Sequence, residues 1–428
     1  MPSISKKLRS LGVQVGVDQL TSPPSSDLEK HEANHKLEEI LSGKILNTPQ
    51  GETFAVDKVY PDPHQHGKEV LSRYAALDGL ARWSGEQDIK VFPPQSFAFI
   101  DTETTGLSGG TGTYAFLIGV GRFIDKDFHL TQLLMRDPIE EAAQLYALEQ
   151  LLATCSAIVT FNGKSFDLPL LRTRYVTHRW PDPFTDYPHI DLLHLSRRLW
   201  RDRLPSRTLG NLEHHILGTI RTDEDIPGWE IPQIYFNFLN TGDASLLKQV
   251  IYHNAMDIVS LAALFNHTAK LLSNPLEAAA EYGVDVIALG KLFEELGETR
   301  LATRLYRTGL EHKDVSSDRV PEIVYIDGLM RLARIHKREN NYRVSISLWE
   351  KAAHINHIPA FIELAKYYEH KEGDFSTALD WTQAAINSLL NPTTSGLRQM
   401  INRSRWIPEL EHRIARLERK LTKLENNE

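Results

Sequence analysis

The sequence FAFIDTETTG, residues 97–106, ends an apolar run with two carboxylates, Asp101 and Glu103. The run has the composition of a buried strand, and side chains two positions apart on a strand point to the same face of it. Two negative charges on one face repel each other unless a positive charge lies between them. Because a divalent cation is the usual solution, this stretch predicts a metal site at the end of a central strand.

The composition limits the classes of protein that fit the chain. Its 428 residues favour two or three domains, and 48 basic against 56 acidic residues give a net charge of −8. An acidic protein does not hold nucleic acid through its whole surface, so any such contact needs a local basic patch. The only cysteine, Cys155, excludes an internal disulfide framework and a cysteine-rich zinc module.

The hydropathy pattern argues against membrane association. No window approaches the roughly 20 apolar residues of a membrane span. The N-terminal residues MPSISKKLRSLG are basic but lack a continuous apolar core behind them. We therefore expect a cytoplasmic protein with no membrane partner.

Four regions can be distinguished along the chain. Residues 1–43 are polar, contain SPPSS and predict a flexible tail with one short helix near residues 28–41. Residues 44–94 hold strand fragments and one helix, and we expect them to form an accessory segment packed on the next domain. Residues 95–274 alternate strands and helices, whereas residues 275–428 show helical patterns only.

The region from residue 95 to residue 274 predicts a mixed sheet. The segments FAFID, TYAFLIGVGRFI and FHLTQLLM are joined by short turns, which favours antiparallel pairing. The segments AIVTF and HIDLLHL alternate with helices, which favours parallel strands. A long apolar-periodic helix at residues 244–272 closes the region. The prediction is an α/β domain whose mixed five-stranded sheet is flanked by helices.

A repeated pattern of small and aromatic residues occupies the last region. The three units contain Gly290, Phe293, Ala302, Tyr306 and Gly309; Ala333, His336, Ser345, Trp349 and Ala352; and Ala365, Tyr368 and Ala378. Small residues where two helices cross, with aromatic residues between them, suit helix pairs that stack on their neighbours. After Pro408, leucine and isoleucine at four-three spacing predict a final helix that either caps the repeats or forms a short coiled coil.

Two later segments carry acids in surroundings comparable to those of the first. FNGKSFD follows the strand AIVTF and places Asp167 at a helix start, where it is either a helix cap or a catalytic acid. YHNAMD places Asp257 within an otherwise apolar helix, where burial of a charge is costly without a partner. Asp257 is therefore either a metal ligand or a hydrogen-bonded core residue.

Together, DTETTG, FNGKSFD and YHNAMD resemble the DEDD exonucleases of the ribonuclease H-like fold, also called DnaQ-like, in order, spacing and context. More narrowly, FIDTETTGLSGGTGTYAFLIGVG, TFNGKSFDLPLLRTRY, HIDLLHLSRRLWRDRL and YHNAMDIVSLAAL resemble the YprB-type ribonuclease H-like family, in which helical repeats follow such a domain. The first resemblance covers residues 95–272, and the second covers most of the chain. The repeats look like tetratricopeptide repeats with an irregular step.

The resemblance implies a metal-dependent exonuclease. By that resemblance, the ligands of two divalent cations are Asp101, Glu103, Asp167 and Asp257. Ligands that are all oxygen favour Mg²⁺ or Mn²⁺. Two ions about 4 Å apart clamp a phosphodiester, one lowering the pKa of the attacking water and the other stabilising the leaving 3′ oxygen.

The general base departs from the superfamily's two patterns, which are tyrosine four residues before the last Asp or histidine five before it. Here His253 stands four residues before Asp257 and Tyr252 stands five before it. On a helix these positions lie about 40° and about 140° from Asp257, so helical geometry favours His253, provided that the helix already includes Tyr252. An imidazole is also the better proton acceptor near neutral pH. We therefore predict His253 as the base, with Tyr252 as the alternative.

A basic segment, RRLWRDRLPSR at residues 197–207, is the strongest candidate for contacts with a phosphate backbone. Trp200 offers an indole for base stacking, and the alternative is a solvated helix face. Lys164 either contacts a phosphate or flanks a turn, and Asp191 either lies behind the metal ligands or caps a strand end. The candidate substrate contacts are Thr104, Asn162, Lys164, Arg197, Arg198, Trp200, Arg201 and Arg203.

Three functions fit these observations. The first is a two-metal 3′ to 5′ exonuclease acting on DNA, whose repeats bind a protein partner; the family resemblance implies DNA repair beside a helicase. The second is an exoribonuclease, because a two-metal site attacks either backbone. The third is an interaction scaffold with an inactive nuclease domain, against which the four intact acids count.

Overall fold

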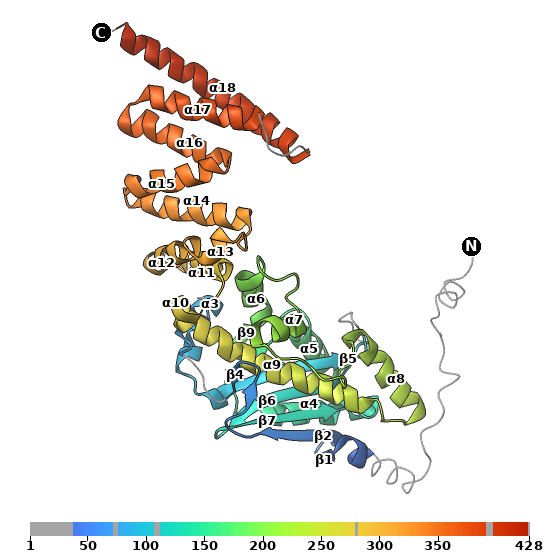
Figure 1. Ribbon diagram of the computed structural model, residues 1–428. Coiled ribbons are helices and arrows are strands. Elements are labelled where there is room, and N and C mark those ends of the chain that lie inside the picture. Colours follow the sequence, from blue (N-terminus) through green and yellow to red (C-terminus); the bar gives the residue numbers. More distant parts are fainter. Residues whose placement is uncertain (1–36, 72–75, 107–111, 279–280, 391–396, 427–428) are drawn as a thin grey trace, which may run out of the picture. The chain divides into compact units, whose positions relative to one another are not determined.

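A computed structural model describes residues 37–71, 76–106, 112–278, 281–390 and 397–426 (Figure 1). Most of the tail predicted at residues 1–43 therefore lies outside the described residues. Its last part is folded, because residues 37–41 are helical and the side chains of Leu37 and Leu41 are buried.

The chain divides into two compact units. The first comprises the residues up to 197 together with 206–273, and the second comprises 198–205 and 274–428. The division after residue 273 lies one residue from the boundary proposed between the α/β domain and the repeats. The short segment 198–205, which we placed in the α/β domain, belongs to the helical unit.

A seven-stranded mixed sheet forms the centre of the first unit. Its strands follow the order β1-β2-β7-β6-β5-β8-β9. Their bounds are β1 Lys44–Thr48, β2 Gly51–Tyr60, β5 Phe97–Thr104, β6 Ala115–Ile124, β7 Asp127–Leu134, β8 Ala157–Thr160 and β9 His189–Asp191. The pairs β5 with β8 and β8 with β9 are parallel, and the other pairs are antiparallel. The predicted α/β fold with a mixed sheet is confirmed.

Two of the seven strands come from the segment that we expected to form an accessory layer. β2 pairs with β7 from Phe54 opposite Leu134 to Tyr60 opposite Phe128, and β1 pairs with β2. The predicted number of five strands is therefore too small. Without β2, the outer edge of β7 would expose a row of unpaired backbone N–H and C=O groups, and β2 satisfies them. A separate hairpin is formed by β3 (Gln65–His66) and β4 (Glu69–Val70).

Helices cover both faces of the sheet. Besides the helical residues 37–41, the helices of the described residues that begin before residue 273 are α3 Asp78–Ser84, α4 Glu141–Leu152, α5 Asp167–Thr177, α6 Leu192–Trp200, α7 Leu209–Leu212, α8 Ile231–Thr241 and α9 Leu247–Ser273. Short 3₁₀ turns of this unit are η1 Gln87–Val91, η2 Pro94–Ser96, η3 Pro138–Glu140 and η5 Gly228–Glu230, and η4 Glu213–Leu217 is a π turn. A second π turn, η6 Tyr368–Glu372, lies in the second unit.

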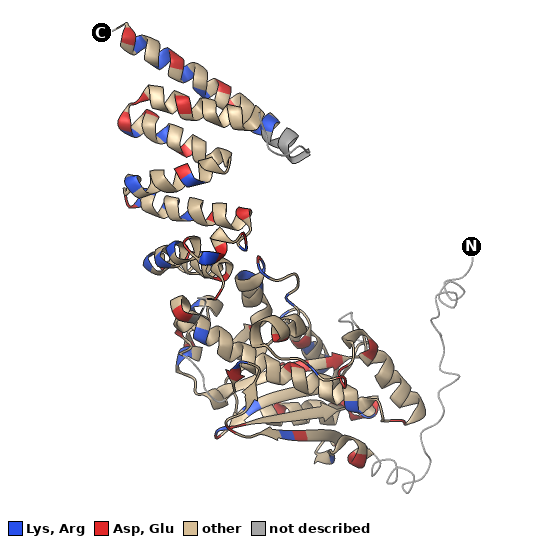
Figure 2. Ribbon diagram, in the orientation of Figure 1, with Lys and Arg blue, Asp and Glu red and all other residues tan. Residues whose placement is uncertain are grey.

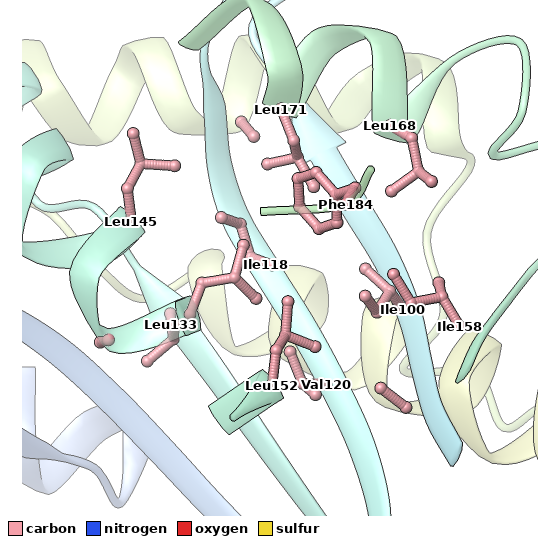
Figure 3. Packing of buried hydrophobic residues seen from close by; sticks show 14 of the residues in the cluster. Ile100, Ile118, Val120, Leu133, Leu145, Leu152, Ile158, Leu168, Leu171 and Phe184 are labelled. Carbon is pink, nitrogen blue, oxygen red and sulfur yellow. The ribbon is translucent and has the colours of Figure 1, made fainter. Parts of the chain in front are cut away.

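Alternation along β5 sends its side chains into two different cores. Ala98 and Ile100 belong to the core beneath α4 and α5, which Figure 3 shows from close by. Phe97 and Phe99 contact Phe265 of α9, with ring centroids 5.1 and 5.6 Å apart. Since successive strand residues face opposite sides, β5 has one face toward α4 and α5 and the other toward α9.

The second unit is helical in its described residues. Its helices are α10 Pro275–Ala278, α11 Gly283–Glu295, α12 Thr299–Leu310, α13 Lys313–Ser316, α14 Glu322–Arg338, α15 Tyr342–His354, α16 Ile358–Tyr367, α17 Phe375–Leu390 and α18 Leu397–Glu425. The pairs α11 with α12, α14 with α15 and α16 with α17 pack together. Of all helices that the structure describes, none is long and apolar enough to cross a membrane.

Residues of the repeated pattern lie at the contacts within two successive helix pairs. A Cβ added to Gly290 of α11 would lie 2.8 Å from the Tyr306 ring of α12. In the next pair, the Ser345 hydroxyl of α15 donates a hydrogen bond to the Ala333 carbonyl of α14 at 3.0 Å. Small side chains are therefore found where the helices of a pair approach each other most closely.

The last helix packs on its own chain. Leu410 and Leu417 of α18 are fully buried, and the buried Glu369 carboxylate binds three cations of α18. The cations are Arg413 at 3.0 Å, Arg416 at 2.6 Å and Lys420 at 2.9 Å. This packing agrees with the capping alternative, and Figure 2 shows acidic and basic residues interspersed along α18.

Candidate metal and catalytic site

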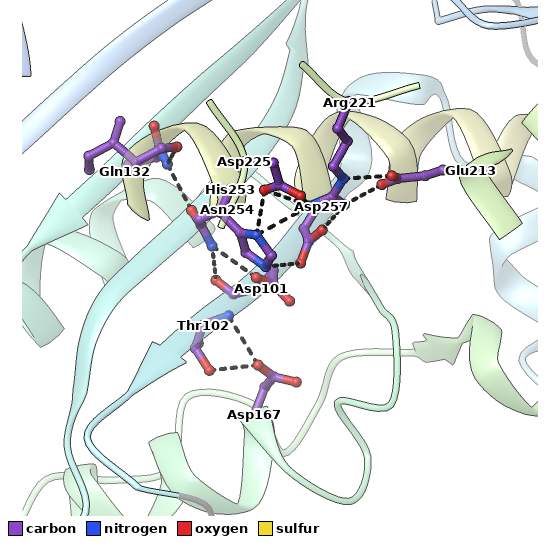
Figure 4. A network of polar contacts seen from close by, with 11 residues as sticks. Asp101, Thr102, Gln132, Asp167, Glu213, Arg221, Asp225, His253, Asn254 and Asp257 are labelled. Atoms are coloured by element: carbon purple, nitrogen blue, oxygen red, sulfur yellow. Dashed lines mark hydrogen bonds and ion pairs between the residues drawn. The ribbon is translucent and has the colours of Figure 1, made fainter. Parts of the chain in front are cut away.

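Two acidic side chains at the end of β5 form the centre of the candidate site. Since Phe97 and Phe99 face α9, alternation along the strand turns Asp101 and Glu103 toward the same helix. Asn254 of α9 donates a hydrogen bond from Nδ2 to Asp101 Oδ2 at 2.9 Å (Figure 4). Asp101 and Glu103 therefore lie between the strand β5 and the helix α9.

Asp167 approaches β5 from the other face of the strand. It is the first residue of α5, and Phe166 occupies the N-cap position. Asp167 Oδ1 accepts hydrogen bonds from the Thr102 backbone N–H at 3.1 Å and from the Thr102 hydroxyl at 2.6 Å. The helix-cap alternative for Asp167 is therefore wrong, because its carboxylate is directed to the strand.

Helix α9 supplies two further predicted residues. The ligand atoms of Glu103, His253 and Asp257 all lie within 4.8 Å of one another. His253 Nε2 lies 3.6 Å from Asp257 Oδ2, one helical turn away. Both His253 and Tyr252 lie inside α9, so the helical geometry on which the choice between them depends applies. The Tyr252 hydroxyl instead accepts a hydrogen bond from the Thr222 backbone N–H at 3.2 Å.

A chain of amide contacts, not predicted from the sequence, orients Asp101. Gln132 of β7 donates to Asn254 Oδ1 at 2.9 Å and to the Ile251 carbonyl at 2.8 Å. Since Asn254 Oδ1 accepts from Gln132, its Nδ2 group is turned toward Asp101. Gly119 of β6 permits this packing, because an added Cβ would lie 2.3 Å from Asn254 Oδ1.

Three charged residues that sequence reasoning missed complete the site. Arg221 forms ion pairs with Glu213 of η4 and with Asp257, donating to Glu213 Oε2 at 2.6 Å. Asp225 Oδ1 lies 2.7 Å from His253 Nδ1. Arg221 and Asp225 lie in the connection between η4 and η5, and no local pattern marks them, because only the tertiary course of that connection brings them to α9.

The acids of the site are crowded. Burial raises the pKa of Asp101 and of Glu103 well above the ordinary values, and repulsion from Asp257 and Asp167 raises both further. Burial also raises the pKa of Asp257, although the Arg221 guanidinium opposes this effect. The pKa of Asp167 rises to about 6, chiefly because of burial. Such a group of carboxylates favours the uptake of protons or of a cation.

The set of donor atoms fits divalent cations. Carboxylate oxygens are the ligands that Mg²⁺ and Mn²⁺ prefer, and a cation among these acids would relieve the repulsion that raises their pKa. Asp101, Glu103, Asp167 and Asp257 are close enough to repel one another, and of these Glu103 and Asp257 offer ligand atoms within 4.8 Å. His253 also offers a ligand atom within reach of Glu103 and Asp257.

The loop FNGKSFD is held by an acid at the end of β9. Asp191 accepts hydrogen bonds from the backbone N–H groups of Asn162 at 2.8 Å and Lys164 at 3.0 Å. This agrees with the capping alternative for Asp191. The Lys164 side chain is exposed, so its contact with a phosphate stays a prediction. The Thr104 hydroxyl donates to the Gly106 carbonyl at 2.9 Å within the turn after β5.

Several side chains of the basic segment, residues 197–207, are buried or ion-paired rather than free to contact nucleic acid. Trp200 is 1% exposed, so its indole is not available to stack on a base, and this prediction is wrong. Arg203 pairs with Asp285 at 3.0 Å, and Arg198 pairs with Glu295. Both acids belong to α11, so the segment is held within the helical unit by a buried indole and two ion pairs. Two further arginines of the segment are exposed, Arg197 and Arg201.

Comparison with known proteins agrees with the fold. A family described as the RNase_H superfamily matches residues 98–269, a span that contains the four acids and His253. The chain is 33% identical over 369 residues to the uncharacterized protein YprB of Bacillus subtilis (strain 168), and the match covers 84% of each chain. An RNase_H superfamily domain implies a nuclease that acts on nucleic acid.

Proposed function

The chain belongs to the family of the Bacillus subtilis protein YprB and carries an RNase_H superfamily domain, and on this basis we propose that it is a metal-dependent 3′ to 5′ exonuclease acting on DNA. The observation that carries the proposal is the cluster of Glu103, His253 and Asp257, whose ligand atoms lie within 4.8 Å of one another. Asp101 and Asp167 are close enough to repel Glu103 or Asp257 electrostatically.

The four acids share one task in this proposal, which is to hold the metal ions. Asp101, Glu103, Asp167 and Asp257 hold two divalent cations, Mg²⁺ or Mn²⁺. When bound, these ions would activate the attacking water and stabilise the departing 3′ oxygen. Asn254 keeps Asp101 turned toward α9, and Thr102 keeps Asp167 turned toward β5. The substrate phosphate therefore meets carboxylates whose positions are fixed before it binds.

His253 serves as the general base. Its Nε2 lies 3.6 Å from Asp257 Oδ2, a separation too long for a hydrogen bond. That nitrogen is therefore available to take the proton of the attacking water. Tyr252 is the alternative base, but its hydroxyl is engaged by the Thr222 backbone.

The direction of attack, the preference for DNA and a role in DNA repair are proposed from the resemblance to DEDD exonucleases and to the YprB-type family. The helix pairs of the second unit, which we take to be tetratricopeptide-like repeats, would bind a protein partner such as a helicase. The exposed side chains of Lys164 and Arg197, both in the first unit, would hold the phosphate backbone.

A cleavage assay tests the proposal. Oligonucleotides of one sequence, as single- and double-stranded DNA and as RNA, are labelled at the 5′ end and incubated with the full chain in Mg²⁺, Mn²⁺ or EDTA. We expect 5′-labelled DNA to shorten one nucleotide at a time in the presence of metal only. Faster shortening of RNA would replace DNA by RNA as the substrate.

Matched variants identify the site. Asp101→Asn is expected to slow cleavage at least about 100-fold, because stabilisation of the transition state by several kcal/mol depends on the ion ligands. Asp88→Asn changes an exposed acid outside the cluster and is expected to cleave at the wild-type rate. Cleavage in EDTA, or a wild-type rate for Asp101→Asn, would refute the metal-dependent mechanism, and no cleavage of any substrate would favour the scaffold.

A further inference from the structure

The connection between η4 and η5 contacts the imidazole of His253 on the side away from the acid cluster. Asp225 Oδ1 lies 2.7 Å from His253 Nδ1. On the opposite edge of the ring, His253 Nε2 faces Glu103 and Asp257. Figure 4 shows the contacts of the His253 ring with Asp225 and with Asp257. The two nitrogens of one imidazole therefore have different neighbours and different tasks.

The short contact decides which nitrogen carries the proton. An ionised carboxylate only accepts hydrogen bonds, so a separation of 2.7 Å from Asp225 requires a proton on Nδ1. Arg221 Nη1 also lies near Nδ1, but at 3.4 Å, and a guanidinium only donates. The shorter of the two contacts places a proton on Nδ1, so in the neutral ring it is Nε2 that carries the lone pair and faces the acids.

Asp225 is itself held in place. Its backbone N–H donates to the Thr222 carbonyl at 3.1 Å, which closes a turn. The Thr222 N–H in turn donates to the Tyr252 hydroxyl, beside His253 on α9. The buried side chain of Ile226 anchors the residue that follows Asp225 in the core. The turn therefore presents its carboxylate to His253 from a fixed position.

We propose that Asp225 is the positioning residue of the site, because it holds the His253 ring with Nδ1 protonated and Nε2 directed at the acid cluster. The inference deepens the proposed function, since it supplies the group that prepares the general base. It applies equally if Nε2 binds a cation, because a metal-bound imidazole needs the same tautomer and commonly donates its other N–H to a carboxylate.

The tautomer can be measured directly by ¹⁵N NMR of the imidazole rings in the full chain treated with a chelator. His253→Phe identifies the signals by their loss. We expect wild-type His253 as the Nδ1–H tautomer, and we expect Asp225→Ala to convert it largely to the Nε2–H tautomer or to a mixture. The neighbouring acid Asp223 is exposed, and Asp223→Asn is expected to leave the signals unchanged.

Cleavage kinetics give the second readout. Asp225→Asn preserves volume but removes the charge, and we expect kcat to fall roughly 10- to 100-fold, the usual cost of losing such a partner. KM is expected to stay within about twofold, because Asp225 contacts Nδ1 of His253 and not Nε2, which faces the acid cluster. Asp223→Asn is expected to keep the wild-type kcat, and melting curves establish that both variants are folded.

The two readouts separate this inference from the proposed function. If wild type cleaves no substrate but the tautomer changes as expected, the positioning role stands and the exonuclease proposal fails. An Nε2–H tautomer in the wild type, or an unchanged tautomer in Asp225→Ala, would overturn the positioning role. An active wild type whose kcat survives Asp225→Asn and Asp225→Ala would overturn it as well.

Discussion

Asp101 and Asp167 are both held by single neighbouring side chains, but from opposite faces of β5. Asp101 accepts from Asn254 of α9, whereas Asp167 accepts from Thr102 of the strand itself. Because alternate residues of a strand face opposite sides, one short segment supplies acids to one face and the hydroxyl that holds Asp167 to the other.

His66 allows the effect of burial on one titratable residue to be tested outside the acid cluster. Its ring is 5% exposed, Nε2 lies 2.8 Å from Ser260 Oγ, and burial lowers the pKa of His66 from 6.5 to about 4. The folded state therefore favours the neutral ring. As the pH falls through 6.5, the unfolded chain binds a proton that the folded chain does not bind until about pH 4, so stability is lost in this window.

Urea unfolding of wild type and His66→Gln at pH 7 and pH 4 measures the effect. Wild type is expected to lose on the order of 1 to 3 kcal/mol more of its unfolding free energy than His66→Gln over this range. His412→Gln, a change at an exposed histidine, is expected to follow wild type. Parallel pH profiles for wild type and His66→Gln would contradict the assignment.

At the residue scale, the proximity of side chains could be predicted where chemistry and spacing coincide, as for Glu103, His253 and Asp257. The acids of β5 could be found because an apolar strand ends in carboxylates, and His253 because it stands one helical turn before Asp257. Arg221 and Asp225 could not be found, because a loop acid or arginine looks the same whether it faces solvent or a buried imidazole. Trp200 was misjudged, since an aromatic among arginines suits both stacking and burial.

At the scale of elements, the close approach of β6 and α9 depends on two glycines of β6: Gly119 faces Asn254, and Gly121 faces Ile258. Gly119→Ala would place a methyl group 2.3 Å from Asn254 Oδ1 and thus displace the amide that holds Asp101. We expect a loss of about 1 to 3 kcal/mol in stability. We also expect Mn²⁺ to raise the melting temperature less than in wild type, because Asp101 loses its orientation.

A matched glycine provides the control for this prediction. A Cβ at Gly210 meets no atom within 4 Å, so Gly210→Ala is expected to show the wild-type response to Mn²⁺ in the same melting experiment. An unchanged response of Gly119→Ala would mean that Asn254 does not control Asp101.

The positions of individual strands were predicted better than the pairing between strands. The alternating segment ETFAVDKVY indicates a strand, and the structure has β2 there, but its pairing with β7 joins residues more than 60 positions apart. Pairing over such distances depends on which faces of the two strands are buried and on the unpaired backbone groups at the edge of β7. Local composition does not specify either of them. The sheet is therefore two strands larger than the sequence suggested.

At the scale of the whole molecule, the loss of strand patterns after residue 274 indicated where the second unit begins. The repeat stays a prediction, which is supported by small residues at the contacts within helix pairs, as with Gly290 and Tyr306. The inclusion of residues 198–205 in the helical unit was not predictable, because it rests on ion pairs with α11 that no local pattern records.

The central claim for the molecule is that the acids around β5 bind divalent cations. Calorimetric titration of Mn²⁺ into the chelator-treated full chain tests it most directly. We predict saturable binding of two ions per chain in wild type and in Asp88→Asn, with at least one ion bound about tenfold or more weakly in Asp101→Asn. The absence of saturable binding in wild type, or equal affinities in wild type and Asp101→Asn, would contradict the claim.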